Sequence, residues 1–83
     1  MFDEKDFNNL GYRQLKQMNL EAALYVFEKT AVLFPTSANA YDSLGEALAI
    51  AGRREQAIES YRKAIALDPT NAGARAKLKE LEK

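Results

Sequence analysis

The sequence repeats itself with a period of 34 residues. A shift of the 83-residue chain by this distance superposes identical residues at these pairs of positions: Leu10 and Leu44, Gly11 and Gly45, Glu21 and Glu55, Ala23 and Ala57, Lys29 and Lys63, Leu33 and Leu67, Pro35 and Pro69, and Thr36 and Thr70. A second shift continues the match weakly into 72–83. The chain therefore reads as one domain with a repeat over 4–37, a second over 38–71, and part of a third.

Each repeat carries apolar residues at the three- and four-residue steps of amphipathic helices, with one break near its middle. The breaks fall at 17–19 and 51–53. Pro35 and Pro69 close the second helix of each repeat, because proline cannot donate to the helical hydrogen-bond ladder. We predict an all-α fold, a helix-turn-helix repeat array of five helices, with two antiparallel pairs and a capping helix over 72–83.

The predicted helices begin with recognisable capping residues. Ser37 and Asn71 offer side-chain oxygens to the helices that follow the prolines. Asp3 is placed to cap the first helix, and Phe2 and Phe7 are spaced to form a hydrophobic staple around it.

Three glycines lie at positions where glycine is expected to have a specific structural role. Gly52 lies in a predicted turn and suits the left-handed backbone that ends a helix. Gly11 and Gly45 lie inside predicted helices, where glycine costs about 1 kcal/mol relative to alanine. We expect each to let the paired helix approach closely, with Ala23 and Ala57 as the small residues on the other side.

The composition excludes several classes of function. The chain has no histidine and no cysteine, so it offers no imidazole base, no thiolate nucleophile and no ordinary zinc site. We therefore expect no enzyme, no metal and no cofactor. The 12 basic residues balance 12 acidic ones, which leaves no basic face for nucleic acid. No stretch suits a membrane span or an export signal, so a cytoplasmic location is expected unless the chain is a fragment.

The repeated positions also carry a family resemblance. Phe7-x2-Leu10-Gly11, then Ala23, Phe27 and Pro35, returns as Tyr41-x2-Leu44-Gly45, then Ala57, Tyr61, Ala64 and Pro69. This pattern resembles the tetratricopeptide repeat, and 72–83 looks like the solvating helix that closes such arrays. The first repeat departs from the family pattern at Gln14, Met18 and Thr30, where a large apolar residue, the turn glycine and alanine are usual. The run 39–47 is also similar to repeats at the C-terminal end of some bacterial hydrolases.

The resemblance implies a concave groove lined by the first helix of each repeat. Residues on that side would be Lys5, Asn8, Tyr12, Leu15 and Lys16 in the first repeat, and Asn39, Asp42, Glu46 and Ala49 in the second. Asp42 and Glu46 are four residues apart, so they would form a small anionic site beside Tyr12 for a basic or amphipathic peptide. A solvated helix face is the alternative. The family's basic clamp for chaperone C-termini is not expected, because only Lys77 has a suitable charge.

The second helix differs between the repeats on its outer side. Tyr25, Val32 and Phe34 stand where the second repeat has Glu59, Ala66 and Asp68. This apolar patch predicts either a docking surface, including self-association as a two-fold dimer, or ordinary scattered surface residues. Glu59 and Lys63, four residues apart, predict a favourable pair on one helix.

Two functions remain open from the sequence. The first is a non-catalytic protein–protein interaction module that binds a peptide or helix of a partner in the groove. The second is a structural oligomerisation or docking appendage of a larger protein, such as a bacterial hydrolase. Substituting groove residues such as Tyr12 would abolish partner binding in the first case and be silent in the second.

Overall fold

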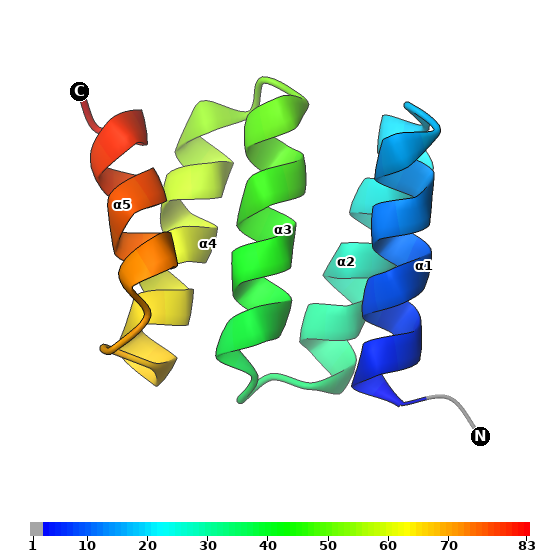
Figure 1. The fold of residues 1–83 in the computed structure, drawn as a ribbon, viewed down its shortest axis with the longest axis horizontal. Helices are drawn as coiled ribbons and strands as arrows, with labels where there is room; N and C mark the ends of the chain where they lie inside the picture. The colour runs from blue at the N-terminus through cyan, green and yellow to red at the C-terminus, as the bar shows by residue number, and fades with distance from the viewer. Residues whose placement is uncertain (1–2) are drawn as a thin grey trace.

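The computed structural model describes residues 3–83, and these residues form five α-helices and no strand. They are α1 (Glu4–Lys16), α2 (Leu20–Leu33), α3 (Ala38–Ile50), α4 (Arg54–Leu67) and α5 (Ala72–Leu81). Two antiparallel pairs, α1 with α2 and α3 with α4, stack side by side, and α5 packs on α4. In Figure 1 the front layer is α1, α3 and α5, and α2 and α4 lie behind it. The predicted all-α repeat array is confirmed.

The predicted caps of α3 and α5 are present. Ser37 Oγ accepts the backbone N–H of Ala40 at 3.1 Å, and Asn71 Oδ1 accepts that of Ala74 at 3.0 Å. Each cap satisfies a backbone donor that the first turn of a helix leaves without a partner. Both caps directly follow a proline turn, so the sequence marks the start of each of these helices clearly.

The first helix begins with a reciprocal pair of carboxylates. Asp3 accepts the backbone N–H of Asp6, and Asp6 accepts that of Asp3, both at 3.0 Å. This capping box confirms the predicted role of Asp3 and adds Asp6 to it. The predicted staple of Phe2 with Phe7 involves a residue outside the described part of the chain. Phe7 itself contacts the ring of Phe34, with ring centroids 6.4 Å apart.

The turns within the two pairs have the same backbone shape but different residues. Gly52 has a φ of 80°, the left-handed conformation predicted for it. Met18, at the equivalent position 34 residues earlier, also has a positive φ, 60°. Methionine pays a steric penalty in this region that glycine avoids, so the first turn is strained relative to the second.

The two helical glycines lie beneath aromatic rings. A Cβ added at Gly11 would stand 2.4 Å from Cε1 of Phe27, and one added at Gly45 would stand 2.9 Å from Cζ of Tyr61. The prediction of a close helix approach is confirmed, but its details need correction. The nearest atoms belong to the rings of Phe27 and Tyr61, and not to Ala23 or Ala57.

Two clusters of buried side chains hold the layers together. The larger one spans three helices, α2 to α4, and contains Ala23, Leu24, Phe27, Ala47, Leu48 and Ala57. The smaller one contains Tyr61, Ala64 and Ala74 and has Leu78 and Leu81 packed against it, so it fastens α5 onto the second pair. The larger cluster therefore joins the repeats to each other, and the smaller one attaches the last helix.

Candidate functional site

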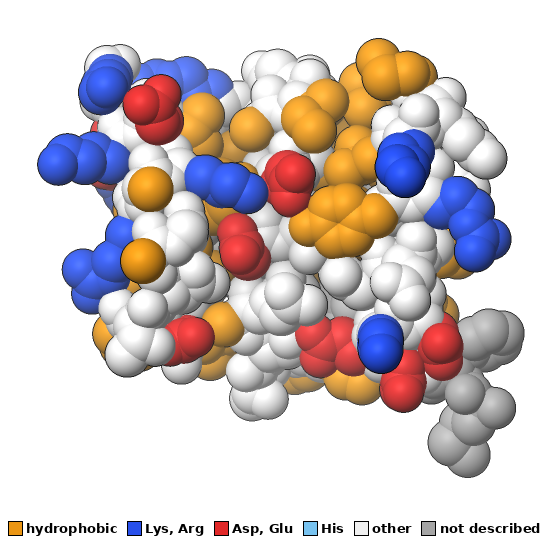
Figure 2. Space-filling model, in the orientation of Figure 1, with side chains coloured by type: hydrophobic (Ala, Val, Ile, Leu, Met, Phe, Trp, Pro, Cys, Tyr) orange, Lys and Arg blue, Asp and Glu red, His pale blue; other side chains and the backbone are white. Residues whose placement is uncertain are grey.

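The front layer presents a face of mixed character. Figure 2 shows this face: apolar side chains gather toward the C-terminal ends of α1 and α3, at the top of the view, while acidic and basic side chains are interspersed over the rest. The first helices of both repeats contribute to it, as the family resemblance implied. Side chains from α5 complete it, so three helices and not two build the face.

A hydrogen-bonded bridge crosses this face. Tyr12 Oη of α1 lies 2.9 Å from Glu46 Oε1 and 3.1 Å from Ser43 Oγ, both on α3. Because the phenol has a single hydrogen, it donates to the carboxylate and accepts from the Ser43 hydroxyl. Glu46 Oε1 is also 3.7 Å from Nζ of Lys77 on α5. We call Tyr12, Glu46 and Lys77 the groove bridge, since it links the three front helices.

Packing fixes the position of the Tyr12 ring. The ring meets Phe27 edge to face, with centroids 5.1 Å apart, so it rests on the larger core cluster. Burial raises the pKa of Tyr12 from 10.0 to about 12, the bond from Ser43 lowers it, and the carboxylate of Glu46 raises it further. The phenol therefore stays neutral and keeps its donor proton across the physiological pH range.

Glu46 and Asp42 do not form the simple anionic site that was predicted. The negative charge of Glu46 is balanced by Lys77, and the carboxylate accepts a hydrogen bond from the Tyr12 hydroxyl. Asp42 Oδ2 accepts a long hydrogen bond of 3.5 Å from Asn71 Nδ2, and its Oδ1 is buried without a partner among residues 3–83. The prediction included Tyr12 but missed Lys77 and Asn71, because both come from the α5 region, distant in sequence from these carboxylates.

Two adjoining hollows flank the groove bridge. The first, about 550 Å³, lies toward α1 and is lined by Asn9, Tyr12, Arg13, Leu15, Lys16, Glu46 and Ile50. The second, about 270 Å³, lies toward α5 and is lined by Glu46, Ala49, Ile50, Tyr61, Lys77, Glu80 and Leu81. Ile50 belongs to both, and its side chain is 52% exposed. The hollows therefore form one depression across the front face, with Glu46 and Ile50 in the middle.

Of the groove residues predicted from the sequence, some line the hollows and others do not. Tyr12, Leu15 and Glu46 line the hollows. Lys5 and Asn39 are exposed on the helices but line neither hollow, and Asn8 is half-buried with its Oδ1 unpaired within the described chain. Sequence reasoning missed Ile50 and Leu81 as lining residues and Lys77 as a bridge residue. The 34-residue period does contain a signal for Lys77. Lys77 is the repeat equivalent of Ser43, and Ser43 contacts Tyr12.

Comparisons with known proteins agree with this architecture. A family model described as TPR repeat, the tetratricopeptide repeat, matches residues 45–78. A crystal structure of MamA superposes with a TM-score of 0.86 at 30% identity, over 95% of this chain and 46% of that one. The chain is a tetratricopeptide-repeat region. A solution structure of a tetratricopeptide repeat domain protein from Salinibacter ruber superposes with a TM-score of 0.75 at 28% identity, over 96% of this chain and 80% of that one.

Two curated relatives are much longer than this chain. It is 38% identical over 72 residues to the Protein CTR9 homolog of Arabidopsis thaliana, and 32% identical over 84 positions to Superkiller protein 3 of Schizosaccharomyces pombe. These matches cover 87% and 96% of the chain but only 7% and 6% of the relatives. Repeats of this family generally mediate protein–protein interactions in non-catalytic, scaffold-like proteins.

The predicted patch on the outer side of α2 is only partly exposed. Tyr25 and Val32 are 63% and 73% exposed, and Nζ of Lys29 lies 5.5 Å from the Tyr25 ring centroid. Phe34 is half-buried, and its ring lies against that of Phe7 of α1. The apolar stripe of this repeat region is therefore Tyr25 and Val32, without Phe34, because the aromatic pair with α1 covers that ring.

The predicted Glu59–Lys63 pair is not formed. Nζ of Lys63 lies instead over the ring of Tyr41, 5.5 Å from its centroid, and the two residues make no ion pair within 3–83. Tertiary contact with α3 thus overrides the local helix pairing that the spacing favoured. The same described residues hold no cluster of three or more potential metal ligands, and no helix among them is long and apolar enough to span a bilayer.

Proposed function

We propose that this repeat region binds a short apolar segment of a partner protein across its front face, with one anchoring side chain in each hollow. The observation that carries the proposal is the pair of adjoining hollows that share Ile50. A depression of this kind, with apolar walls and a few fixed polar groups, suits anchor residues of a bound peptide.

The groove bridge supports this function by making the floor rigid. Tyr12, Glu46 and Lys77 tie α1, α3 and α5 together, so the hollows do not have to be assembled when a partner arrives. A preformed site loses less conformational entropy on binding than a flexible one. The bridge also satisfies its own charges, so the partner need not be basic, in contrast to the expectation from Asp42 and Glu46.

The rim of the first hollow carries two cations, in addition to the anionic pair Asp42 and Glu46 on which the sequence prediction relied. Arg13 and Lys16 line it, and neither forms an ion pair with another residue in 3–83. An acidic residue beside the apolar anchor would complement these two cations and speed the encounter with the partner. The proposed segment therefore has two apolar anchors and an acidic residue at its α1 end.

The test uses peptides selected from a random twelve-residue display library against the intact chain. The affinity of a selected peptide is then measured for the parent and for Ile50→Asp, which places a charge in both hollows. The matched control is Val32→Asp, because Val32 is also exposed and also near the end of a helix, but on the outer side. Circular dichroism confirms that both variants fold.

We expect Ile50→Asp to weaken binding roughly tenfold or more, since it removes a central apolar contact, and Val32→Asp to leave it unchanged. Equal binding by the parent and Ile50→Asp would show that the front face is not the binding site.

A second candidate, self-association or docking through α2, rests on the exposure of Tyr25 and Val32. Tyr25→Glu tests it, because the second repeat has Glu59 at the equivalent position and the fold should accept the change. Light scattering over a concentration series is then compared with the parent. Association that disappears in the variant supports this role, and a parent that stays monomeric throughout removes it.

A further inference from the structure

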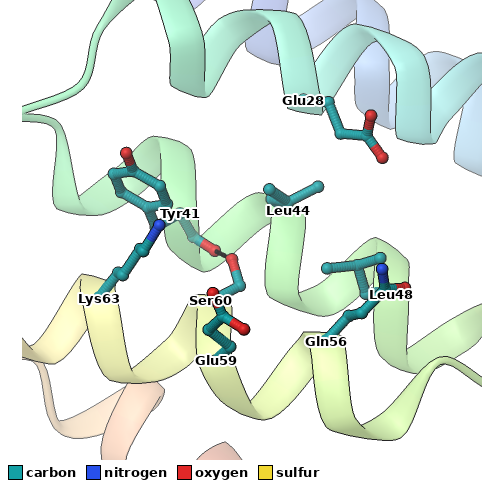
Figure 3. A pocket seen from close by; sticks show the side chains of 8 residues that line it. All are labelled: Glu28, Tyr41, Leu44, Leu48, Gln56, Glu59, Ser60 and Lys63. Atoms are coloured by element: carbon teal, nitrogen blue, oxygen red, sulfur yellow. Dashed lines mark hydrogen bonds between the residues drawn. The ribbon is translucent and has the colours of Figure 1, made fainter.

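A separate cleft lies on the side of α3 that faces α2 and α4. Figure 3 shows it: Glu28 reaches in from α2, while Gln56, Glu59, Ser60 and Lys63 come from α4. Tyr41, Leu44 and Leu48 of α3 lie between them and form the floor. We call this space, of about 350 Å³, the outer cleft. It shares no lining residue with the two hollows of the front face.

The floor of the outer cleft is apolar. Leu48 is almost fully buried in the larger core cluster and Leu44 packs against that cluster, so both leucines are held in place. Ser60 adds little polarity, because its hydroxyl donates to the carbonyl oxygen of Tyr41 at 2.7 Å. A ligand resting on this floor would therefore meet hydrocarbon first.

The walls of the outer cleft carry carboxylates without partners. Glu28 on α2 and Glu59 on α4 make no ion pair or side-chain hydrogen bond to any residue in 3–83. Lys63 would be the natural partner of Glu59, but its ammonium group is held over the Tyr41 ring at the other end of the cleft. The end near Leu48 and Gln56 therefore has the carboxylate of Glu28 and no cation of its own, and Glu59 lies farther along the cleft beside Ser60.

We propose that the outer cleft binds an arginine side chain of a partner protein. The aliphatic stem would lie on Leu44 and Leu48, and the guanidinium would donate to Glu28 on one wall and to the Gln56 amide oxygen on the other, with Glu59 adding negative charge farther along the cleft. Arginine fits better than lysine, because its planar group carries five donors spread over a fork that can serve acceptors on opposite walls together. Desolvation of the stem and charge complementarity would act at the same time.

The experiment is a nitrogen–proton NMR titration of the intact chain with a blocked glycyl-arginyl-glycine tripeptide. The same tripeptide with citrulline, the neutral isostere, is the ligand control. The protein variant is the double substitution Glu28→Gln with Glu59→Gln. Its matched control is Glu21→Gln with Glu55→Gln, which removes the same charge from two exposed glutamates outside the cleft.

We expect saturable shifts at the amides of 44–48 and 56–60 with the arginine peptide and none with the citrulline peptide. The double cleft variant should bind roughly fivefold more weakly, and the control variant should bind like the parent. Higher salt should weaken the interaction, because the pairs are partly exposed.

Three outcomes would overturn the proposal. They are the absence of saturable shifts at the outer cleft, equal shifts with citrulline, and an equal loss of affinity in the control variant. The result is independent of the front-face function, because Ile50→Asp leaves every lining residue of the outer cleft in place. Loss of peptide binding in Ile50→Asp together with retained arginine binding would separate the two sites.

Discussion

The two repeats have the same backbone built from different residues. Both contain a glycine beneath an aromatic ring and a left-handed turn, but the first repeat uses Phe27 and Met18 where the second uses Tyr61 and Gly52. The glycine–ring contact is also tighter in the first repeat. The family model matches 45–78, which includes no part of the first repeat. The first repeat thus keeps the backbone conformation of the second although its residues depart from the family pattern, because packing between the repeats favours that conformation.

The largest difference between the repeats should appear when the rings are removed. We expect Phe27→Ala to destabilise the domain by about 3–5 kcal/mol, enough to unfold much of a small chain. Tyr61→Ala should cost less, because Phe27 lies in the cluster that joins the repeats, whereas the cluster of Tyr61 fastens α5. Urea denaturation followed by circular dichroism measures both losses. A larger loss for Tyr61→Ala would reverse the assignment of the two clusters.

The glycines allow a finer test of the same contacts. Gly11→Ala should destabilise the domain by about 1–3 kcal/mol, since the new methyl group would overlap the buried ring of Phe27. Gly45→Ala should cost less, because its Cβ would stand 2.9 Å or more from the Tyr61 ring. Thermal melts of the two variants compare them directly. If both melt at the parent temperature, the rings are free to move and the first repeat is not the tighter one.

The groove bridge links the repeats and should respond to pH. Tyr12→Phe should cost about 1–2 kcal/mol at neutral pH, because it removes a donor to Glu46 and leaves the buried Ser43 hydroxyl without its acceptor.

At alkaline pH the sign follows from the pKa of Tyr12, which burial raises to about 12 from 10.0. Above pH 10 the unfolded chain loses this proton while the folded chain keeps it, so stability falls as the pH rises toward 12. Burial also raises the pKa of Tyr61, so Tyr12→Phe should flatten part of that fall. An unchanged slope in urea titrations across this range would contradict the buried position of the phenol.

The smallest expected effects come from exchanging the turn residues. Met18→Gly should stabilise the domain by up to about 1 kcal/mol, because it relieves the left-handed strain at a φ of 60°. Gly52→Ala should destabilise it by about 1 kcal/mol for the same reason, although its Cβ would meet no neighbouring atom within 4 Å. Changes in melting temperature of opposite sign are the expected result. A shift in the same direction for both would indicate that the two turns are not equivalent.

Most of the fold could be predicted from the sequence, and less of the site. The prolines, the caps Ser37 and Asn71, and the glycine positions act within a few residues of themselves, so they define each helix locally. The groove bridge joins Tyr12 to Glu46, 34 positions apart, and Glu46 to Lys77, 31 positions apart, so its partners could be inferred only loosely from the period. Glu46 was recognised as a groove residue, but not the cation that neutralises it.

Phe34 and Lys63 show how tertiary contacts redirect side chains. The position of Phe34 in the repeat predicted that it would be part of an outer patch, but Phe7 of α1 covers its ring. The four-residue spacing predicted an ion pair between Lys63 and Glu59, but the ammonium group of Lys63 lies over the ring of Tyr41 on α3. In both cases a ring on a neighbouring helix decided the outcome. Because Lys63 lies over Tyr41, Glu59 makes no ion pair within 3–83, and the outer cleft keeps a second carboxylate.

The sequence by itself determined the number of helices, their limits and the side of each helix that is buried, because periodicity, capping and proline act over one or two turns of chain. Only the tertiary structure decided which charges meet and where space remains. Ile50 became the centre of the front depression, and Glu28 and Glu59 came to line one cleft, through the stacking of helices distant in sequence. The physical reason is that side-chain direction is fixed by a residue's own helix, whereas its partners depend on the distance and angle between helices.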